Sequence, residues 1–272
     1  MPPTTIRIGT DRTVHRLGFG AMRLPTEPAA ERSTAIAVAR RAVELGVTLI
    51  DTAHLYGWGA NEELLAEALH PYPDELLITT KVGVVNTPEG GELCGRPEVL
   101  RHQVDEGLRR LRQDRLELLQ LHRVDPEVPL ADQVGTLREL QLAGKIGHLG
   151  LSEVTVDQLD EARSIAEIAS VQNRYNVLDR EHDAVLDACT EAGIAFLPWR
   201  PVHPLLDAPE IVAVAAELDA TAAQVSLAWL LHRSPMMLPI PGTASLDHLA
   251  ENVAAASLSL TEDQRQRLTA FH

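Results

Sequence analysis

The chain has 272 residues, of which 45% are hydrophobic and 23% are charged, an ordinary composition for a globular protein. Its formal net charge of -15 would repel a phosphate backbone, which argues against nucleic acid as a partner. No apolar run approaches the ~20 residues of a membrane span, and the opening residues show no signal pattern. We therefore expect a cytoplasmic protein with no membrane partner. Cys94 and Cys189 lack metal-ligand spacing, so no metal site is expected.

Short apolar runs that are typical of strands alternate with helical patterns along the chain. The predicted strands cover residues 17–22, 48–53, 76–82, 116–122, 146–152, 170–175, 195–200 and 237–242. The predicted helices cover residues 31–45, 61–69, 97–111, 130–143, 155–166, 181–192, 209–233 (with a break) and 245–256. Helix signals support these bounds, because Asn61 is a candidate cap, Pro97 suits a first turn, and Gly46, Gly144 and Gly193 follow helix ends.

Eight strands alternating with eight helices predict a parallel sheet closed on itself, a (β/α)8 TIM barrel. An open, doubly wound sheet is the alternative, but GFGAMRL after the first strand is not the glycine-rich fingerprint of that fold. Residues 5–8 and 13–16 flank a turn and predict an N-terminal β-hairpin across the bottom of the barrel. Thr261 is expected to cap a short final helix. Residues 1–272 are expected to form a single domain.

Four ionisable residues stand at or just past the ends of successive predicted strands, namely Asp51, Tyr56, Lys81 and His122. Active sites of barrel enzymes lie at this end of the strands. A tyrosine is a poor acid at neutral pH, and a nearby lysine cation favours its phenolate. Singly, each residue has a structural explanation: a turn cap, a loop aromatic, an internal ion pair and a core histidine, respectively. Together they predict a site that donates a proton to a carbonyl group.

The chain resembles the aldo-keto reductase family of NAD(P)H-dependent barrels over nearly its whole length. The motifs that carry the resemblance are LGFGAMRL, GVTLIDTAHLYGWGANEELLAEAL, LLITTKVG, LELLQLHRVD, GKIGHLGLSE, SVQNRYN, GIAFLPWRP and LPIPGTASLDHLAEN. The resemblance implies that Tyr56 is the general acid and that Lys81 lowers its pKa. It also implies that Asp51 pairs with Lys81 and that His122 orients the carbonyl.

The same resemblance implies a nicotinamide cofactor site. Ser152 and Gln172 match residues that bind the carboxamide, and Trp199 matches the aromatic residue that stacks beneath the nicotinamide. The remaining matches border the nicotinamide ribose (Gly20, Ala21 and Met22) or the adenosine 2'-phosphate (Gly242, Thr243, His248, Glu251 and Asn252). Without the resemblance, Gln172 could be a buried polar residue, Ser152 a helix cap, Trp199 a core residue, and Glu251 and Asn252 a solvated helix face.

The chain departs from the family pattern at three informative positions. Glu153 stands where the family usually has asparagine, and a carboxylate cannot donate a hydrogen bond, so either the carboxamide contact changes or Glu153 points away. Gly242 and His248 stand where many members have lysine and arginine. The cofactor is therefore expected to be NADP(H), with a weakened preference over NAD(H) and with NAD(H) possible.

The expected function is the reversible reduction of an aldehyde or ketone to an alcohol, with hydride from NAD(P)H and no metal. A nicotinamide-binding redox sensor or regulatory subunit on the same scaffold is the alternative, and a phosphate-binding isomerase or lyase is another. The partner is a small carbonyl substrate, with pyridoxal as one candidate. Trp58, Arg123 and the loop 201–208 are expected to line its pocket. The protein is expected to be a monomer.

Overall fold

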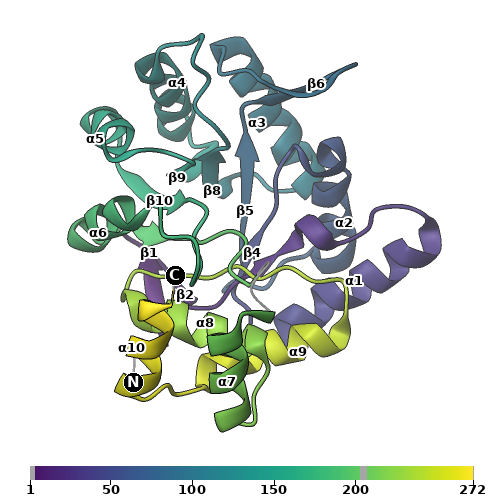
Figure 1. The fold of residues 1–272 in the computed structure, drawn as a ribbon. Helices are drawn as coiled ribbons and strands as arrows, with labels where there is room; N and C mark the ends of the chain where they lie inside the picture. Colours follow the sequence, from purple (N-terminus) through teal and green to yellow (C-terminus); the bar gives the residue numbers. More distant parts are fainter. Residues whose placement is uncertain (1–3, 203–206, 272) are drawn as a thin grey trace.

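The computed structural model describes residues 4–202 and 207–271, and its centre is a seven-stranded parallel sheet (Figure 1). The strand order β3-β4-β5-β8-β9-β10-β11 follows the chain, as in a barrel whose helices cover the outside. These strands are β3 (Phe19–Gly20), β4 (Leu49–Asp51), β5 (Leu77–Val82), β8 (Leu116–Leu121), β9 (Ile146–Ser152), β10 (Ile168–Gln172) and β11 (Ala195–Phe196). The predicted (β/α)8 barrel is confirmed.

The eighth predicted strand, residues 237–242, closes the barrel without forming a regular ladder. Its amide at Leu238 donates to the carbonyl of Phe196 in β11, at 2.8 Å. On the other side, the carbonyls of Pro239 and Pro241 accept hydrogen bonds from the amides of Gly18 and Gly20, at 2.9 and 3.1 Å. The two prolines have no N–H to donate, which is why this segment falls short of a strand although it bridges β11 and β3.

Helices connect the strands along the outer face (Figure 1). They are α1 (Ala29–Glu44), α2 (Ala60–Leu69), α3 (Pro97–Leu111), α4 (Leu130–Leu142), α5 (Val156–Ile165), α6 (Asp183–Ala192), α7 (Pro209–Glu217), α8 (Ala222–Arg233), α9 (Leu246–Ala254) and α10 (Glu262–Ala270), with 3-10 turns η1 (Ala21–Arg23), η2 (Tyr56–Gly59) and η4 (Ala255–Ser257). The predicted break in 209–233 separates α7 from α8. Thr261 caps α10 with a capping box, as predicted.

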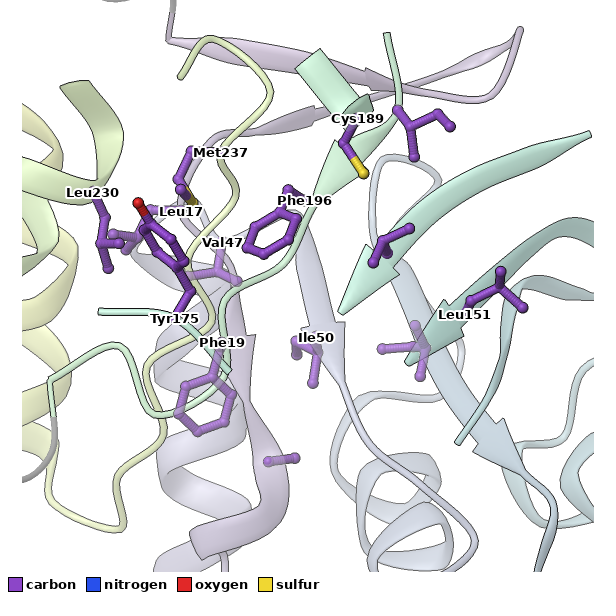
Figure 2. Packing of buried hydrophobic residues seen from close by; sticks show 14 of the residues in the cluster. Leu17, Phe19, Val47, Ile50, Leu151, Tyr175, Cys189, Phe196, Leu230 and Met237 are labelled. Carbon is purple, nitrogen blue, oxygen red and sulfur yellow. The ribbon is translucent and has the colours of Figure 1, made fainter. Parts of the chain in front are cut away.

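The N-terminal hairpin consists of β1 (Thr5–Ile8) and β2 (Arg12–His15), which pair antiparallel. Its residues Ile6, Ile8 and Val14 are buried in one cluster with Leu49 and Leu118 from the barrel strands. Figure 2 shows the hairpin crossing the end of the barrel where the strands begin. The hairpin therefore closes the bottom, and the strand ends at the opposite mouth stay free for a site.

The larger core fills the space between the strands and the helices. Phe19 and Ile50 belong to the neighbouring strands β3 and β4, Leu151 belongs to β9, and Phe196 contacts the ring of Tyr175 edge-on, with ring centroids 5.7 Å apart (Figure 2). Tyr175 also stacks on Trp229 of α8. This packing holds the strand ends in fixed relative positions, which a site built from several strands requires.

An additional hairpin after β5 was not predicted. It consists of β6 (Val84–Thr87) and β7 (Gly90–Leu93), which pair antiparallel. At Gly91 a Cβ atom would lie 3.3 Å from the Leu55 side chain and 3.4 Å from that of Trp58. This hairpin therefore packs against the loop that carries Tyr56 and forms part of the wall of the barrel mouth.

Candidate active site

The four predicted catalytic residues come from three neighbouring strands and meet at the mouth of the barrel. Asp51 is the last residue of β4, and Tyr56 begins η2 five residues later. Lys81 lies in β5, and His122 directly follows β8. Parallel strands deliver their carboxyl ends to the same edge, so residues far apart in the sequence converge there.

Lys81 and Asp51 form a buried ion pair at the centre of this cluster. The Lys81 Nζ atom lies 2.7 Å from Asp51 Oδ2 and donates to the carbonyl of Thr52 at 2.8 Å. Relative exposure is 0% for Lys81 and 2% for Asp51. Burial alone would lower the pKa of Lys81, but Asp51 and Tyr56 raise it, and the net shift is upward. The lysine therefore remains a cation across the neutral range.

Tyr56 completes this cluster, because Lys81 Nζ also donates to its hydroxyl at 3.4 Å. The same ammonium lies 5.0 Å from the centre of the tyrosine ring. Burial raises the pKa of the Tyr56 phenol, the Lys81 cation lowers it, and the Asp51 carboxylate raises it, with a net upward shift. Lys81 thus lowers the pKa of Tyr56, as predicted, but its effect is smaller than the increase caused by burial. At neutral pH the hydroxyl carries its proton.

His122 lies beside the Tyr56 ring. Its ring meets that of Tyr56 edge-on, with the centroids 6.1 Å apart and an interplanar angle of 86°. Burial, then the positive charges of Lys81 and Arg123, lower the pKa of His122 from 6.5 to about 2. The imidazole is therefore neutral at physiological pH, and it offers an N–H donor rather than a charge.

Two glutamines form the floor beneath the ion pair. Gln172 Nε2 donates to Asp51 Oδ1 at 2.9 Å, and Gln120 Nε2 donates to the same oxygen at 3.2 Å. Gln172 was a predicted cofactor residue, whereas Gln120 was missed. The signal was present, because Gln120 is a polar residue in an apolar strand and lies two positions before His122, on the same face. The side-chain amides of Gln120 and Gln172 thus fix the Asp51 carboxylate, which in turn pairs with Lys81.

The loop that carries Tyr56 is fixed from α2 and α3. Arg110 of α3 lies against Gly59, and its Nη1 atom contacts His54 Nδ1 at 2.9 Å and Glu62 Oε2 at 3.3 Å. Asn61 was expected to cap α2, and that expectation is wrong. The N-cap is Gly59, with φ of 95°, and Asn61 instead donates to the carbonyl of Ala21 at 3.0 Å.

The end of β9 carries Ser152 and Glu153. Ser152 is buried, and its Oγ accepts a hydrogen bond from Arg123 Nη1 at 3.0 Å. Glu153 points away from Ser152, which is one of the two alternatives expected for a carboxylate at this position. Its Oε1 accepts from the backbone amide of Arg174 at 2.7 Å and from the indole of Trp199 at 2.5 Å. Trp199 is half-buried, so part of its ring remains open to the mouth.

Gly20 and Gly242 approach each other closely on the opposite side of the mouth. A Cβ atom at Gly242 would lie 2.7 Å from the Gly20 carbonyl oxygen and 3.5 Å from the Cγ of Arg23. A side chain at 242 would therefore require the backbone to move. The cradle between these strand ends is lined by backbone and by the Arg23 stem.

The other residues predicted to contact the cofactor follow this cradle or lie beside it. Thr243 is nearly buried, and its Oγ1 accepts from the amide of Ser245, the N-cap of α9, at 3.0 Å. His248 is exposed, Glu251 is half-buried, and Asn252 is buried on the same helix. The structure therefore places all of these residues at one end of the barrel, together with Ala21 and the exposed Met22 of η1.

A cavity of about 720 Å³ lies between α8 and α10, and none of the predicted site residues line it. It includes Arg180, Arg233 and Arg265, whose guanidinium groups contact acidic side chains or backbone carbonyls. Of the predicted loop 201–208, residues 203–206 lie outside the described part of the chain. Among the described residues, no single helix could cross a membrane, although α7 and α8 together have the length and composition and are bent by 94°.

Comparison with known proteins agrees with this arrangement. The model of the aldo/keto reductase family matches residues 16–272. The chain belongs to this family. It is 41% identical to pyridoxine 4-dehydrogenase of Escherichia coli, over 97% of this chain and 96% of that protein. It is 44% identical to an uncharacterized oxidoreductase of Schizosaccharomyces pombe, over 95% of this chain and 87% of that protein.

Solved structures of this family superimpose on the whole barrel. An aldo/keto reductase of Klebsiella pneumoniae in complex with NADP and acetate has a TM-score of 0.87 at 26% identity, over 97% of this chain and 94% of that chain. A thermostable aldo-keto reductase bound to the inhibitor epalrestat has a TM-score of 0.89 at 27% identity, over 98% and 99%. This reductase is therefore an NAD(P)H-dependent enzyme that reduces carbonyl groups, and nothing supports the sensor or the isomerase alternative.

Proposed function

We propose that Tyr56 donates the proton in the reduction of an aldehyde or ketone to an alcohol. The observation that carries this proposal is the buried Lys81 ammonium, 2.7 Å from Asp51 and 3.4 Å from the Tyr56 hydroxyl. When bound, NAD(P)H supplies the hydride. As the carbonyl oxygen gains negative charge, Tyr56 transfers its proton to that oxygen, and the adjacent cation stabilises the resulting phenolate. Asp51 keeps Lys81 in place.

His122 orients the carbonyl in this proposal. Because its pKa is lowered to about 2, the neutral ring donates one N–H to the carbonyl oxygen. A neutral donor polarises the carbonyl without competing with Tyr56 as the acid. Tyr56 and His122 together then hold the oxygen from two sides, which fixes the carbonyl carbon relative to the hydride donor.

The residues at the strand ends fit a nicotinamide. The hydroxyl of Ser152 accepts from Arg123, so its own proton can be donated to a carboxamide oxygen. Gln172 uses its Nε2 on Asp51, so its Oε1 can accept from the carboxamide amine. Trp199 presents its ring for stacking, and the backbone of Gly20, Ala21 and Met22 borders the ribose.

The adenosine 2'-phosphate site lies at Gly242, Thr243, His248, Glu251 and Asn252 in this proposal. The Gly20–Gly242 cradle lets a ligand approach the backbone, and the stem of Arg23 lies beside it. NADP(H) is preferred, because the Thr243 hydroxyl and the first backbone amides of α9 offer a phosphate hydrogen-bond donors. The preference is smaller than in members with two fixed cations, and NAD(H) is accepted at higher concentration.

The substrate is a small carbonyl compound that enters beside Trp58 and Arg123. Pyridoxal is the leading candidate, because the chain is 41% identical to pyridoxine 4-dehydrogenase of Escherichia coli. We further propose that residues 1–272 form a single domain, and that the protein is a cytoplasmic monomer.

A panel of carbonyl compounds that includes pyridoxal, assayed with NADPH and with NADH, tests this proposal. We expect reduction of at least one aldehyde, with a higher kcat/KM for NADPH than for NADH. Tight NADPH binding without reduction of any carbonyl would instead favour a regulatory, cofactor-sensing role.

A further inference from the structure

Glu153 links the ends of three neighbouring strands. It directly follows Ser152, the last residue of β9, and its amide donates to the carbonyl of Gln172 in β10 at 3.1 Å. Its φ of 56° is left-handed, a conformation that residues with a Cβ atom rarely adopt. With the main chain in this turn, the Oε1 atom receives hydrogen bonds from Arg174, past the end of β10, and from Trp199, past the end of β11.

Trp199 is fixed through both its backbone and its ring. Its amide donates to the Asn173 carbonyl at 3.2 Å, and its carbonyl accepts from the Tyr175 amide at 3.5 Å. The ring is half-buried, with its Nε1 edge on Glu153 and the guanidinium of Arg200 5.5 Å from its centre. Without Glu153, the backbone contacts would remain, but no described residue would hold the indole edge.

We infer that Glu153 is a positioning residue that sets the ring of Trp199 in the orientation in which it stacks beneath the nicotinamide. This inference rests on the proposed function for the role of Trp199 as the stacking residue. Glu153 thereby compensates for the absence of the asparagine that the family usually has at this position. A preset ring loses less rotational freedom when the cofactor binds, so the contact increases cofactor affinity.

A direct contact between Glu153 and the carboxamide is the competing explanation, and variants distinguish the two. In Glu153→Gln, the amide oxygen can still accept both hydrogen bonds. In Glu153→Ala, the acceptor of both hydrogen bonds is lost. In Trp199→Phe, an aromatic ring remains but has no N–H. If Glu153 acts through Trp199, the alanine substitution should have little further effect once the indole N–H is absent.

The experiment measures the Kd for NADPH by calorimetry in the wild type, the three single variants and the Glu153→Ala/Trp199→Phe double variant. The indole N–H resonance of Trp199 is recorded by NMR in the cofactor-free proteins, with assignment from Trp199→Phe. We expect Glu153→Ala to weaken NADPH binding by up to about tenfold, the size expected when one further side chain must be ordered on binding, and to shift the Trp199 resonance. In Glu153→Gln, both the Kd for NADPH and the Trp199 resonance should stay close to those of the wild type.

In the Trp199→Phe background, Glu153→Ala should weaken NADPH binding by less than about a further twofold, since the hydrogen bond from the indole to Glu153 is already absent. An equal loss in both backgrounds, or an unshifted indole resonance in Glu153→Ala, would overturn the inference. Wild-type protein that does not bind NADPH would overturn the proposed function instead, while the NMR comparison still decides whether Glu153 holds the indole. If Glu153→Ala does not fold, Glu153→Leu provides the same comparison.

Discussion

Replacing Lys81 by methionine removes the cation beside Tyr56 while keeping a side chain of similar length. The Lys81 Nζ atom lies 3.4 Å from the Tyr56 hydroxyl. Two unit charges at this separation interact by about 5 kcal/mol at an effective dielectric constant of about 20. If the Asp51 carboxylate offsets about half of this, about 2.5 kcal/mol remain, or about 10²-fold in rate. We therefore expect Lys81→Met to lower kcat for aldehyde reduction by at least that factor.

The assay is steady-state NADPH oxidation with an accepted aldehyde from pH 6 to pH 9, together with thermal unfolding. Removing Lys81 alone leaves Asp51 buried without its partner, which costs about 3–5 kcal/mol of stability. The Asp51→Asn/Lys81→Met double variant removes both charges and serves as the matched control. It should be more stable than Lys81→Met but should remain as inactive. Wild-type turnover in Lys81→Met at every pH would refute the charge-coupling argument.

Three further outcomes are expected. Because the pKa of His122 is lowered to about 2 and that of Tyr56 is raised, reduction should be independent of pH near neutrality and decrease only above about pH 10, as a pH–rate profile will show. His248→Arg should tighten NADPH binding about tenfold without changing the Kd for NADH. Gly242→Ala should destabilise the protein by about 1–3 kcal/mol in denaturant unfolding, because its Cβ would meet the Gly20 carbonyl.

The sequence was sufficient to predict the barrel and the meeting of the proposed catalytic residues, because both follow from strand ends. Apolar runs mark the strands, and parallel strands in a barrel deliver their ends to one mouth. Asp51 and Lys81, 30 residues apart, could therefore be placed together before any distance was known. Two short strand runs, residues 5–8 and 13–16, that flank a turn also predicted the hairpin at the bottom.

Contacts that depend on side-chain direction could not be predicted in this way. Glu153 was recognised as a departure from the family, but its hydrogen bond to Trp199 depends on a left-handed backbone that no pattern signals. The absence of a lysine at 242 was visible in the sequence, whereas the close approach of Gly20 and Gly242 was not. Asn61 resembled a helix cap, but the N-cap of α2 is Gly59, two residues earlier. Asn61 instead donates a hydrogen bond to the carbonyl of Ala21 in η1.

The most direct test of the mechanism is the Tyr56→Phe variant, measured for both NADPH binding and turnover. This change removes one hydroxyl and keeps the ring, so the cofactor site is unaltered. We predict a Kd for NADPH close to that of the wild type and a loss of aldehyde reduction of about 10²–10⁴-fold, the usual contribution of a general acid. Near-normal turnover in Tyr56→Phe would contradict the assignment of Tyr56 as the proton donor.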